Sequence, residues 1–222
     1  MVVKDCNFSV QKGEMIGLMG ESGSGKSTLA KLLIGLEKPS QGQVLLDGQP
    51  YSVKKSGVRI LLVFQDSLHS VNPHFTVEQV LTEALPKDVA REEIEAILED
   101  VGLDKSFLSQ PARQLSGGQL QRICIARGLL LKPDVLIFDE ALSGLDPIVQ
   151  GRLLRLLYDL WEKYRLTYLF ISHDFKLSYA LCHRILVMAD GEIVDEIKDF
   201  ELPIQAHHPV TKKLIGDKGH FS

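Results

Sequence analysis

The sequence predicts an α/β fold with a mostly parallel sheet, an antiparallel β portion and an inserted helical subdomain. Short apolar runs alternate with helix-length segments in both halves of the chain, which is typical of parallel strands joined by crossover helices. In the middle of the chain, apolar residues recur at helical spacing among acidic ones. The dipeptides Asp47-Gly48 and Asp190-Gly191 are hairpin signals and predict antiparallel strands.

The elements follow from these patterns in chain order. Apolar and β-branched runs predict strands over residues 2–3, 8–10, 15–19, 43–48, 59–64, 134–138, 167–171, 184–189 and 192–195. Helical spacing predicts helices over residues 29–36, 76–101, 119–130, 147–164 and 174–182. Asp146 and Pro147 form a helix start, with Asp as the N-cap and Pro at the first helical position.

The composition suits one globular domain of 222 residues with a net charge of −4. We expect a core over about residues 1–66 and 131–198, a helical insertion over about 67–130 and a polar tail over about 199–222. The slight acidity argues against a protein that coats nucleic acid. Three widely separated cysteines give no metal or iron–sulfur spacing and indicate a reducing compartment. Neither a membrane-spanning run nor a signal peptide is evident, so we expect a cytoplasmic protein.

One stretch carries a specific motif. Gly20-Glu21-Ser22-Gly23-Ser24-Gly25-Lys26-Ser27-Thr28 fits G-x-x-x-x-G-K-[ST], the phosphate-binding loop. Its glycines let successive backbone N–H groups face one anion. Lys26 supplies a charge to the outer phosphates and Ser27 a hydroxyl to Mg²⁺. With a strand before it and a helix after it, this loop predicts a P-loop NTPase core that binds a nucleotide.

A second segment, 135–140, is an apolar strand that ends in Asp139 and Glu140. Carboxylates at the C-terminal end of a parallel strand point into the crevice where ligands bind. We expect Asp139 to hold Mg²⁺ and Glu140 to polarise the attacking water. A strand with polar end residues is common, and the phosphate loop is what favours the catalytic interpretation.

Three further positions complete the pattern. Leu115-Ser116-Gly117-Gly118-Gln119 precedes a helix and reads as a second anion site, because a plain cap does not call for two consecutive glycines. Gln65 and His173 each follow a strand. Alone, such residues are more often surface or structural ones; here Gln65 is a candidate ligand of metal or water, and His173 a candidate contact to the transferred phosphoryl group.

Together these segments resemble the ATPase domain of ABC proteins, in that family's order and over essentially the whole chain. The resemblance identifies 20–28 as Walker A, Gln65 as the Q-loop, 115–119 as the signature and 135–140 as Walker B. Ser143-Gly144-Leu145-Asp146 corresponds to the D-loop, with Gly144 where alanine is more usual, and His173 to the switch histidine.

The resemblance implies a mechanism and its partners. ATP and Mg²⁺ are the expected cofactors, with Ser27, Gln65 and Asp139 as metal ligands and Glu140 as the catalytic carboxylate. Two ATPase subunits meet head to tail, so that Ser116, Gly117, Gly118 and Gln119 contact the ATP of the partner subunit, while Asp146 lies at the dimer contact. The motion is expected to reach two transmembrane permease subunits through a groove at about residues 65–80.

A narrower resemblance concerns residues 71–77 and 208–214. They look like "LNPRMTV" and "HPYTKxL" in the ATPases of the oligopeptide, dipeptide and nickel import branch. This implies an importer motor for peptides, nickel or metal chelates, peripheral on the cytoplasmic face of the membrane. A related second ATPase and an extracytoplasmic solute-binding protein are expected partners, and nucleic acid is not. An exporter ATPase and a soluble ABC protein of DNA repair or translation are the alternatives.

The family stacks adenine on an aromatic residue upstream of the strand that begins here near Val2. No such residue precedes Val2, and Phe8 is interpreted as a core residue of an alternating segment. We therefore expect weak nucleotide affinity.

Overall fold

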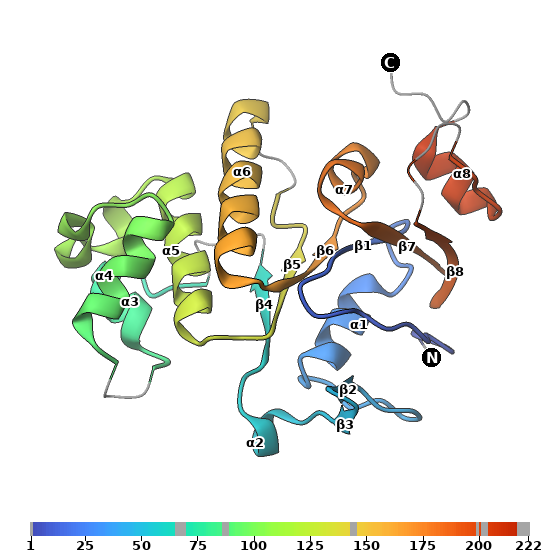
Figure 1. Ribbon diagram of the computed structural model, residues 1–222, viewed down its shortest axis with the longest axis horizontal. Coiled ribbons are helices and arrows are strands. Elements are labelled where there is room, and N and C mark those ends of the chain that lie inside the picture. The colour runs from blue at the N-terminus through green and yellow to red at the C-terminus, as the bar shows by residue number, and fades with distance from the viewer. Residues whose placement is uncertain are drawn as a thin grey trace.

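A six-stranded sheet forms the centre of the protein. The computed structural model describes residues 2–64, 70–85, 89–142, 146–198, 200 and 204–216. The strands lie in the order β4-β5-β6-β1-β7-β8 (Figure 1). Neighbours from β4 to β7 are parallel, and β8 is antiparallel to β7, which confirms the predicted fold class. The bounds are β1 Met15–Met19, β4 Ile60–Phe64, β5 Val135–Asp139, β6 Thr167–Ile171, β7 Arg184–Ala189 and β8 Glu192–Ile197.

Each face of the sheet has its own apolar core because side chains alternate along a strand. On β1, Met15 and Met19 pack into the core that includes residues of α6 (Pro147–Tyr164) and α7 (Phe175–Leu181). Ile16 and Leu18 pack on the other face against α1 (Lys26–Leu33). Figure 1 shows α1 and the pair α6 and α7 on opposite faces of the sheet. Both faces of β1 are therefore buried, and the loop that follows β1 starts from a fixed point.

Three aromatic rings fix β5 against β6. Phe138 lies edge-on to Tyr168, with 5.2 Å between ring centroids, and stacks on Phe170 at 5.0 Å. Such pairs add stabilisation beyond the buried area. Glu140 follows Phe138 by two residues and His173 follows Phe170 by three, so this packing fixes the strand ends from which both extend.

A group of helices lies beyond the β4 edge of the sheet (Figure 1). It contains α3 (Val77–Thr82), α4 (Arg91–Asp100), α5 (Gly117–Leu130) and two short 3₁₀ turns, Lys105–Ser109 and Ala112–Gln114. The predicted helical stretch 76–101 is thus at least two helices. Thr76 begins α3 with a reciprocal capping box to Gln79, as a threonine followed three residues later by glutamine favours. Most residues of α5 are buried, since it lies between these helices and β4.

A small hairpin follows α1 in the chain. It consists of β2 (Leu45–Leu46) and β3 (Gln49–Pro50), which pair antiparallel around Asp47-Gly48, followed by the short helix α2 (Val53–Ser56). The hairpin prediction is confirmed, although each strand is only two residues long.

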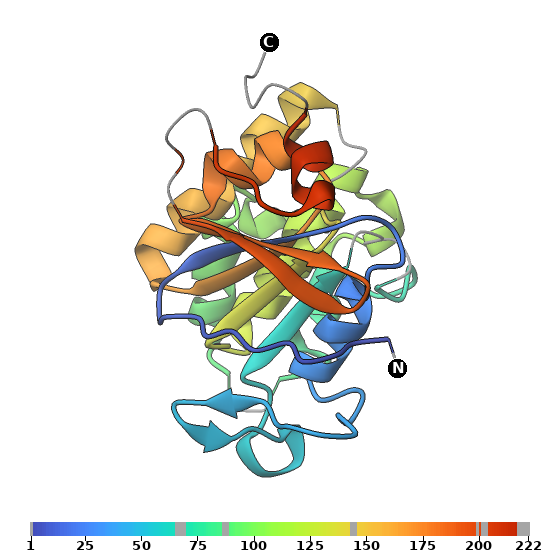
Figure 2. The same ribbon diagram turned by 90° about the vertical axis from the view of Figure 1, so that its right-hand side faces the viewer.

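The prediction of strands at the start of the chain is wrong. Segments 2–3 and 8–10 form no strand. Between them the chain makes an isolated backbone contact, Lys4 N–H to Gly191 O at 2.7 Å. Phe8 still packs against the core, as expected. The polar tail contains the helix α8 (Pro209–Ile215), which lies beside the β7–β8 edge (Figures 1 and 2). Its buried residues Thr211 and Ile215 are too few to produce a clear periodic pattern.

The described helices include none with the length and apolarity needed to cross a bilayer.

Candidate nucleotide-binding and catalytic site

The loop between β1 and α1 needs glycine at two positions. Gly20 has φ +157° and Gly25 has φ +108°, a region that side chains disfavour. A Cβ on Gly20 would lie 2.2 Å from the carbonyl oxygen of Met188, and one on Gly25 2.9 Å from that of Val2. The loop is therefore pressed against the end of β7 and the N-terminal segment. Both positions therefore require glycine because neighbouring backbone packs closely against them, in addition to the need for a ligand to approach.

Lys26 lies at the base of this loop and is 9% exposed. Its Nζ donates to the carbonyl oxygens of Gly20 at 2.8 Å and Glu21 at 2.9 Å. Burial lowers the pKa of Lys26, while the charges of Glu140 and Asp139 act in the opposite direction. The ammonium is thus held inside the loop, facing the acids at the end of β5.

A separate observation indicates that the loop fits a phosphate group. The hydroxyl oxygen of Ser24 is buried and has no hydrogen-bond partner among the residues that the structure describes. It lies within the loop, 2.7 Å from the position that a Cβ on Gly20 would take. An unpaired buried hydroxyl is costly, and a phosphate oxygen in the loop would pair with it.

Ser27 and Asp139 meet at the same place. Burial raises the pKa of Asp139, and the nearby Ser27 side chain acts in the opposite direction. Their oxygens suit Mg²⁺, which takes one or two protein ligands together with water and substrate phosphates. Over the ranges that the structure describes, no group of three or more His, Cys, Asp or Glu residues is placed to hold a metal without such a substrate.

Glu140 follows Asp139 with φ +52°, an unusual conformation for a glutamate. Its N–H donates to the carbonyl oxygen of Ile171 at 2.9 Å, which holds it at the end of β6. The carboxylate Oε1 lies 3.0 Å from Nδ1 of His173. The His173 ring is 67% exposed, whereas Glu140 is 26% exposed. The two predicted catalytic residues are therefore in direct contact.

Parts of the predicted site lie outside the described residues. These are Gln65 and the D-loop residues Ser143, Gly144 and Leu145. The strand register aligns Phe64, the residue before Gln65, with Asp139. Asp146 is described: it caps α6, accepting the N–H of Ile148 at 2.9 Å.

The signature segment 115–119 begins α5. Ser116 and Gln119 form a capping box, with Gln119 N–H donating to Ser116 Oγ at 3.3 Å and Ser116 N–H to Gln119 Oε1 at 2.8 Å. Among the described residues, a Cβ on Gly117 or Gly118 would meet no atom within 4 Å outside its own helix. Packing against the other described elements therefore requires neither glycine.

This segment also lies away from the phosphate loop of its own chain. Two strands, β5 and β6, separate β4 from β1 in the sheet, which corresponds to about 14 Å. The helix α5 belongs to the group beyond β4, whereas α1 packs beneath the sheet (Figure 1). The fold brings Walker A, Walker B and His173 together but not the signature.

Two glutamines that the sequence did not single out support the site. Buried Gln121 donates from Nε2 to the carbonyl oxygen of Ala141 at 2.6 Å, and Gln150 to that of Leu142 at 3.1 Å. They hold the chain just after Glu140 from two helices, α5 and α6. Nothing in the sequence signals such contacts, since they depend on how the helices pack.

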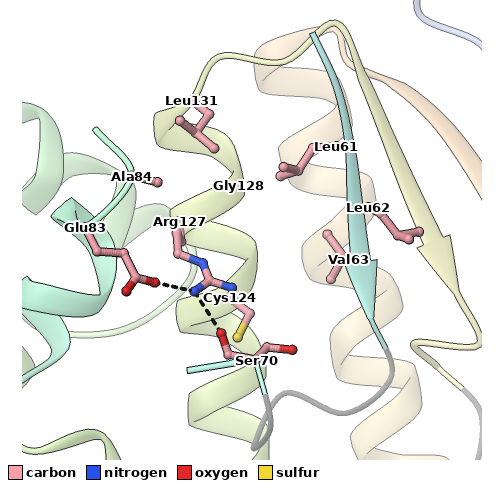
Figure 3. A pocket seen from close by; sticks show the side chains of 10 residues that line it. All are labelled: Leu61, Leu62, Val63, Ser70, Glu83, Ala84, Cys124, Arg127, Gly128 and Leu131. Atoms are coloured by element: carbon pink, nitrogen blue, oxygen red, sulfur yellow. Dashed lines mark hydrogen bonds and ion pairs between the residues drawn. The ribbon is translucent and has the colours of Figure 1, made fainter. Parts of the chain in front are cut away.

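A separate pocket of about 210 Å³ lies between β4, α3 and α5. Figure 3 shows the Arg127 guanidinium between the carboxylate of Glu83 and the carbonyl oxygen of Ser70, at 2.7 and 2.9 Å. The remaining lining is mainly apolar and includes Leu61 and Leu131. Ser70, which belongs to the predicted groove at residues 65–80, is one of the residues that line this pocket.

Residues 3–143 match the family model described as ABC transporter. The chain belongs to the ABC transporter family. It has the function of an ATP-binding subunit that hydrolyses ATP, as the shared ATPase domain indicates.

Curated relatives are similar along the whole chain. The nickel import ATP-binding protein NikE of Escherichia coli O6:K15:H31 is 41% identical over 100% of this chain and 81% of its own length. The metal-staphylopine import system ATP-binding protein CntF of Staphylococcus aureus is 38% identical over 96% and 88%.

Solved structures agree with this assignment. CbiO1 of Clostridium perfringens, part of the ABC transporter complex CbiONQ, has a TM-score of 0.79 at 28% identity, over 88% of this chain and 81% of its own. The ATP-binding cassette MJ0796, dimeric with ADP and Pi after hydrolysis, has a TM-score of 0.73 at 27% identity, over 89% and 90%.

Proposed function

We propose that this chain is the ATP-hydrolysing motor subunit of an importer for nickel, metal chelates or peptides. The observation that carries the catalytic part is the contact of Glu140 with His173, next to the buried ammonium of Lys26. The cargo class rests on the nickel and metal-staphylopine import relatives. Their names favour import over the two alternatives, an exporter ATPase and a soluble ABC protein of DNA repair or translation.

Each residue of the site has a distinct task. The loop 20–28 binds the phosphates through its N–H groups, Ser24 and Lys26. Ser27 and Asp139, with Gln65, are the proposed ligands of Mg²⁺, which when bound would neutralise charge on the phosphate oxygens. Glu140 accepts a proton from, and orients, the attacking water. His173 holds the Glu140 carboxylate in place and contacts the transferred group.

The signature supports a two-subunit site. Open space around Gly117 and Gly118, together with the N-terminus of α5, suits a phosphate group that arrives from outside the chain. In this proposal, Ser116 to Gln119 contact the ATP held by a second ATPase subunit. Asp146 lies at the contact between the two. A related but different second subunit is the expected partner.

The pocket around Arg127 supports a docking role. Its apolar lining beside a hydrogen-bonded arginine resembles the make-up of interface hot spots. Two permease subunits would dock here and along residues 65–80, which places the chain peripherally on the cytoplasmic face of the membrane. An extracytoplasmic solute-binding protein acts on the same complex, and nucleic acid plays no part. The proposed division is a core of about 1–66 and 131–198, an insertion of 67–130 and a tail of 199–222.

The replacement Glu140→Gln tests the catalytic proposal. It keeps the size of the side chain and removes the base, so ATP hydrolysis should fall by about 100-fold or more. ATP-dependent pairing with the partner ATPase should persist and be visible by size-exclusion chromatography. Phosphate release measures the hydrolysis.

Glu162→Gln is the matched control, since Glu162 is exposed on α6. It should hydrolyse ATP at the wild-type rate. Normal hydrolysis by Glu140→Gln would show that the assigned role is wrong.

A further inference from the structure

The sequence motif in the tail, 208–214, forms a helix fixed to the sheet edge. One carboxylate oxygen, Oδ2 of Asp195 on β8, accepts both the backbone N–H of His208, at 2.8 Å, and the hydroxyl of Thr211. Thr211 is fully buried, and Ile215 is 9% exposed. These contacts fix the position and direction of α8 beside the edge formed by β7 and β8 (Figure 2).

From this fixed helix one side chain reaches the phosphate loop. Nζ of Lys213 lies 2.5 Å from Oε1 of Glu21, although 192 residues separate the two in the sequence. Both side chains are partly open to solvent, 76% and 46% exposed. The hydrogen bond and charge of Lys213 lower the pKa of Glu21 and so favour its ionised form. The backbone oxygen of the same glutamate accepts a hydrogen bond from Lys26.

The negative charge of Glu21 disfavours the binding of an anion at this site. This residue belongs to the loop that binds the anionic phosphates, and like charges repel. Lys213 compensates that charge and also limits the positions that the Glu21 side chain takes. Lys212, its neighbour on α8, is exposed as well, but the structure gives it no such contact with the loop.

We propose that Lys213 is a positioning residue for nucleotide binding: carried by α8, it neutralises and restrains Glu21, so that the loop binds ATP with this carboxylate compensated. The proposal rests on the proposed ATPase function of the loop and assigns a role to the tail motif. Lys213 acts through Glu21 and takes no part in the chemical step.

The test compares four variants of the full chain: Lys213→Met, Lys213→Arg, Lys212→Met and the double variant Glu21→Gln with Lys213→Met. Binding of a fluorescent ATP analogue and steady-state hydrolysis are the readouts. Lys213→Met should raise the Kd and the KM for nucleotide about two- to fivefold at low salt, the range expected for one exposed ion pair, with kcat unchanged. The difference should shrink in 0.5 M salt, because exposed charges are screened.

The other variants separate charge compensation from a structural effect. Lys213→Arg keeps the charge and should bind close to wild type, as should the control Lys212→Met. The double variant removes both charges and should recover most of the lost affinity. Equal affinity of Lys213→Met and Lys212→Met, or no recovery in the double variant, would overturn the proposal.

Thermal unfolding of each variant is the control for correct folding. Lys213 is exposed enough for its replacements to be tolerated. A wild-type chain that binds the nucleotide without hydrolysing it would contradict the proposed function. The comparison of affinities would still decide the role of Lys213.

Discussion

Nδ1 of His173 lies 3.0 Å from Oε1 of Glu140, although the two residues are 33 positions apart in the sequence. The parallel register of β5 and β6 pairs Asp139 with Ile171, so the residues that follow both strands meet at one edge of the sheet. Glu140 has a left-handed backbone conformation, and its carboxylate contacts the histidine. A base held by a second residue is the arrangement that catalysis of water attack requires.

Replacement of His173 by alanine should lower kcat for ATP hydrolysis by about 100-fold, with KM changed by less than about threefold, because the histidine orients the base and contacts the phosphoryl group during its transfer, and so contributes more to the transition state than to nucleotide binding. Steady-state kinetics would show the split. His183→Ala is the contrasting variant: its Nδ1 accepts the N–H of Met15 at 2.9 Å, so it should lose about 1 kcal/mol of stability and keep kcat. A wild-type kcat for His173→Ala would remove the histidine from the mechanism.

The replacement Gly118→Ala should lower ATP hydrolysis without lowering the stability of the fold. No described atom outside its own helix lies within 4 Å of the added methyl, so stability should be unchanged or higher by up to about 1 kcal/mol. Hydrolysis should nevertheless fall by about 100-fold, because the methyl would meet the phosphates held by the partner subunit.

Gly151→Ala is the matched control for this variant, since a methyl there also meets no described atom outside its own helix within 4 Å and Gly151 lies in a helix. It should gain stability and keep full activity. Urea unfolding and phosphate release measure the two properties. Full activity of Gly118→Ala would argue against a signature site completed by a second subunit.

Glu14→Gln should change how stability depends on pH. Burial raises the pKa of Glu14, but the hydrogen bond and charge of Arg184, at 2.5 Å, more than offset this and leave the pKa below 4.5. Stability from this pair is therefore present above pH 4.5 and is lost as pH falls through the lower, folded-state pKa.

The Glu14→Gln variant should lose about 2–3 kcal/mol at pH 7, because it leaves Arg184 with one carboxylate fewer in a half-buried setting. Its stability should then decline less than that of wild type between pH 5 and pH 3. Urea unfolding at several pH values tests both points, and parallel pH curves for the two proteins would contradict the assignment.

Ala84→Trp should block the pocket around Arg127. The pocket is about 210 Å³, and Ala84 lies on its rim, so an indole there competes with any docked side chain. Co-purification with the permease subunits should fall by about tenfold or more. Lys105→Trp, an exposed position elsewhere among the helices, should bind normally. Undiminished binding by Ala84→Trp would place permease docking elsewhere.

The sequence predicted the elements near the site closely. Strands β6 and β7 have the predicted ends, and Asp146 begins α6 as expected. Buried strands and capped helices carry local signals, since apolar runs and capping residues act within a few positions. The chain ends were predicted poorly. Segments 2–3 and 8–10 have the composition of strands but join no sheet in the described residues, and α8 depends on Asp195 and on burial against the sheet.

The sequence by itself determined the residue types of the site: a phosphate loop, a strand ending in two acids, and a serine with two glycines before a helix. Each of these is a short continuous stretch of sequence whose residue types indicate a chemical role. Only the tertiary structure decided which of them meet. It brings Lys26, Asp139, Glu140 and His173 together because parallel strands end at one edge, and it leaves the signature apart because β5 and β6 intervene. It also placed Lys213 on Glu21, a contact between the two ends of the chain that no local pattern specifies.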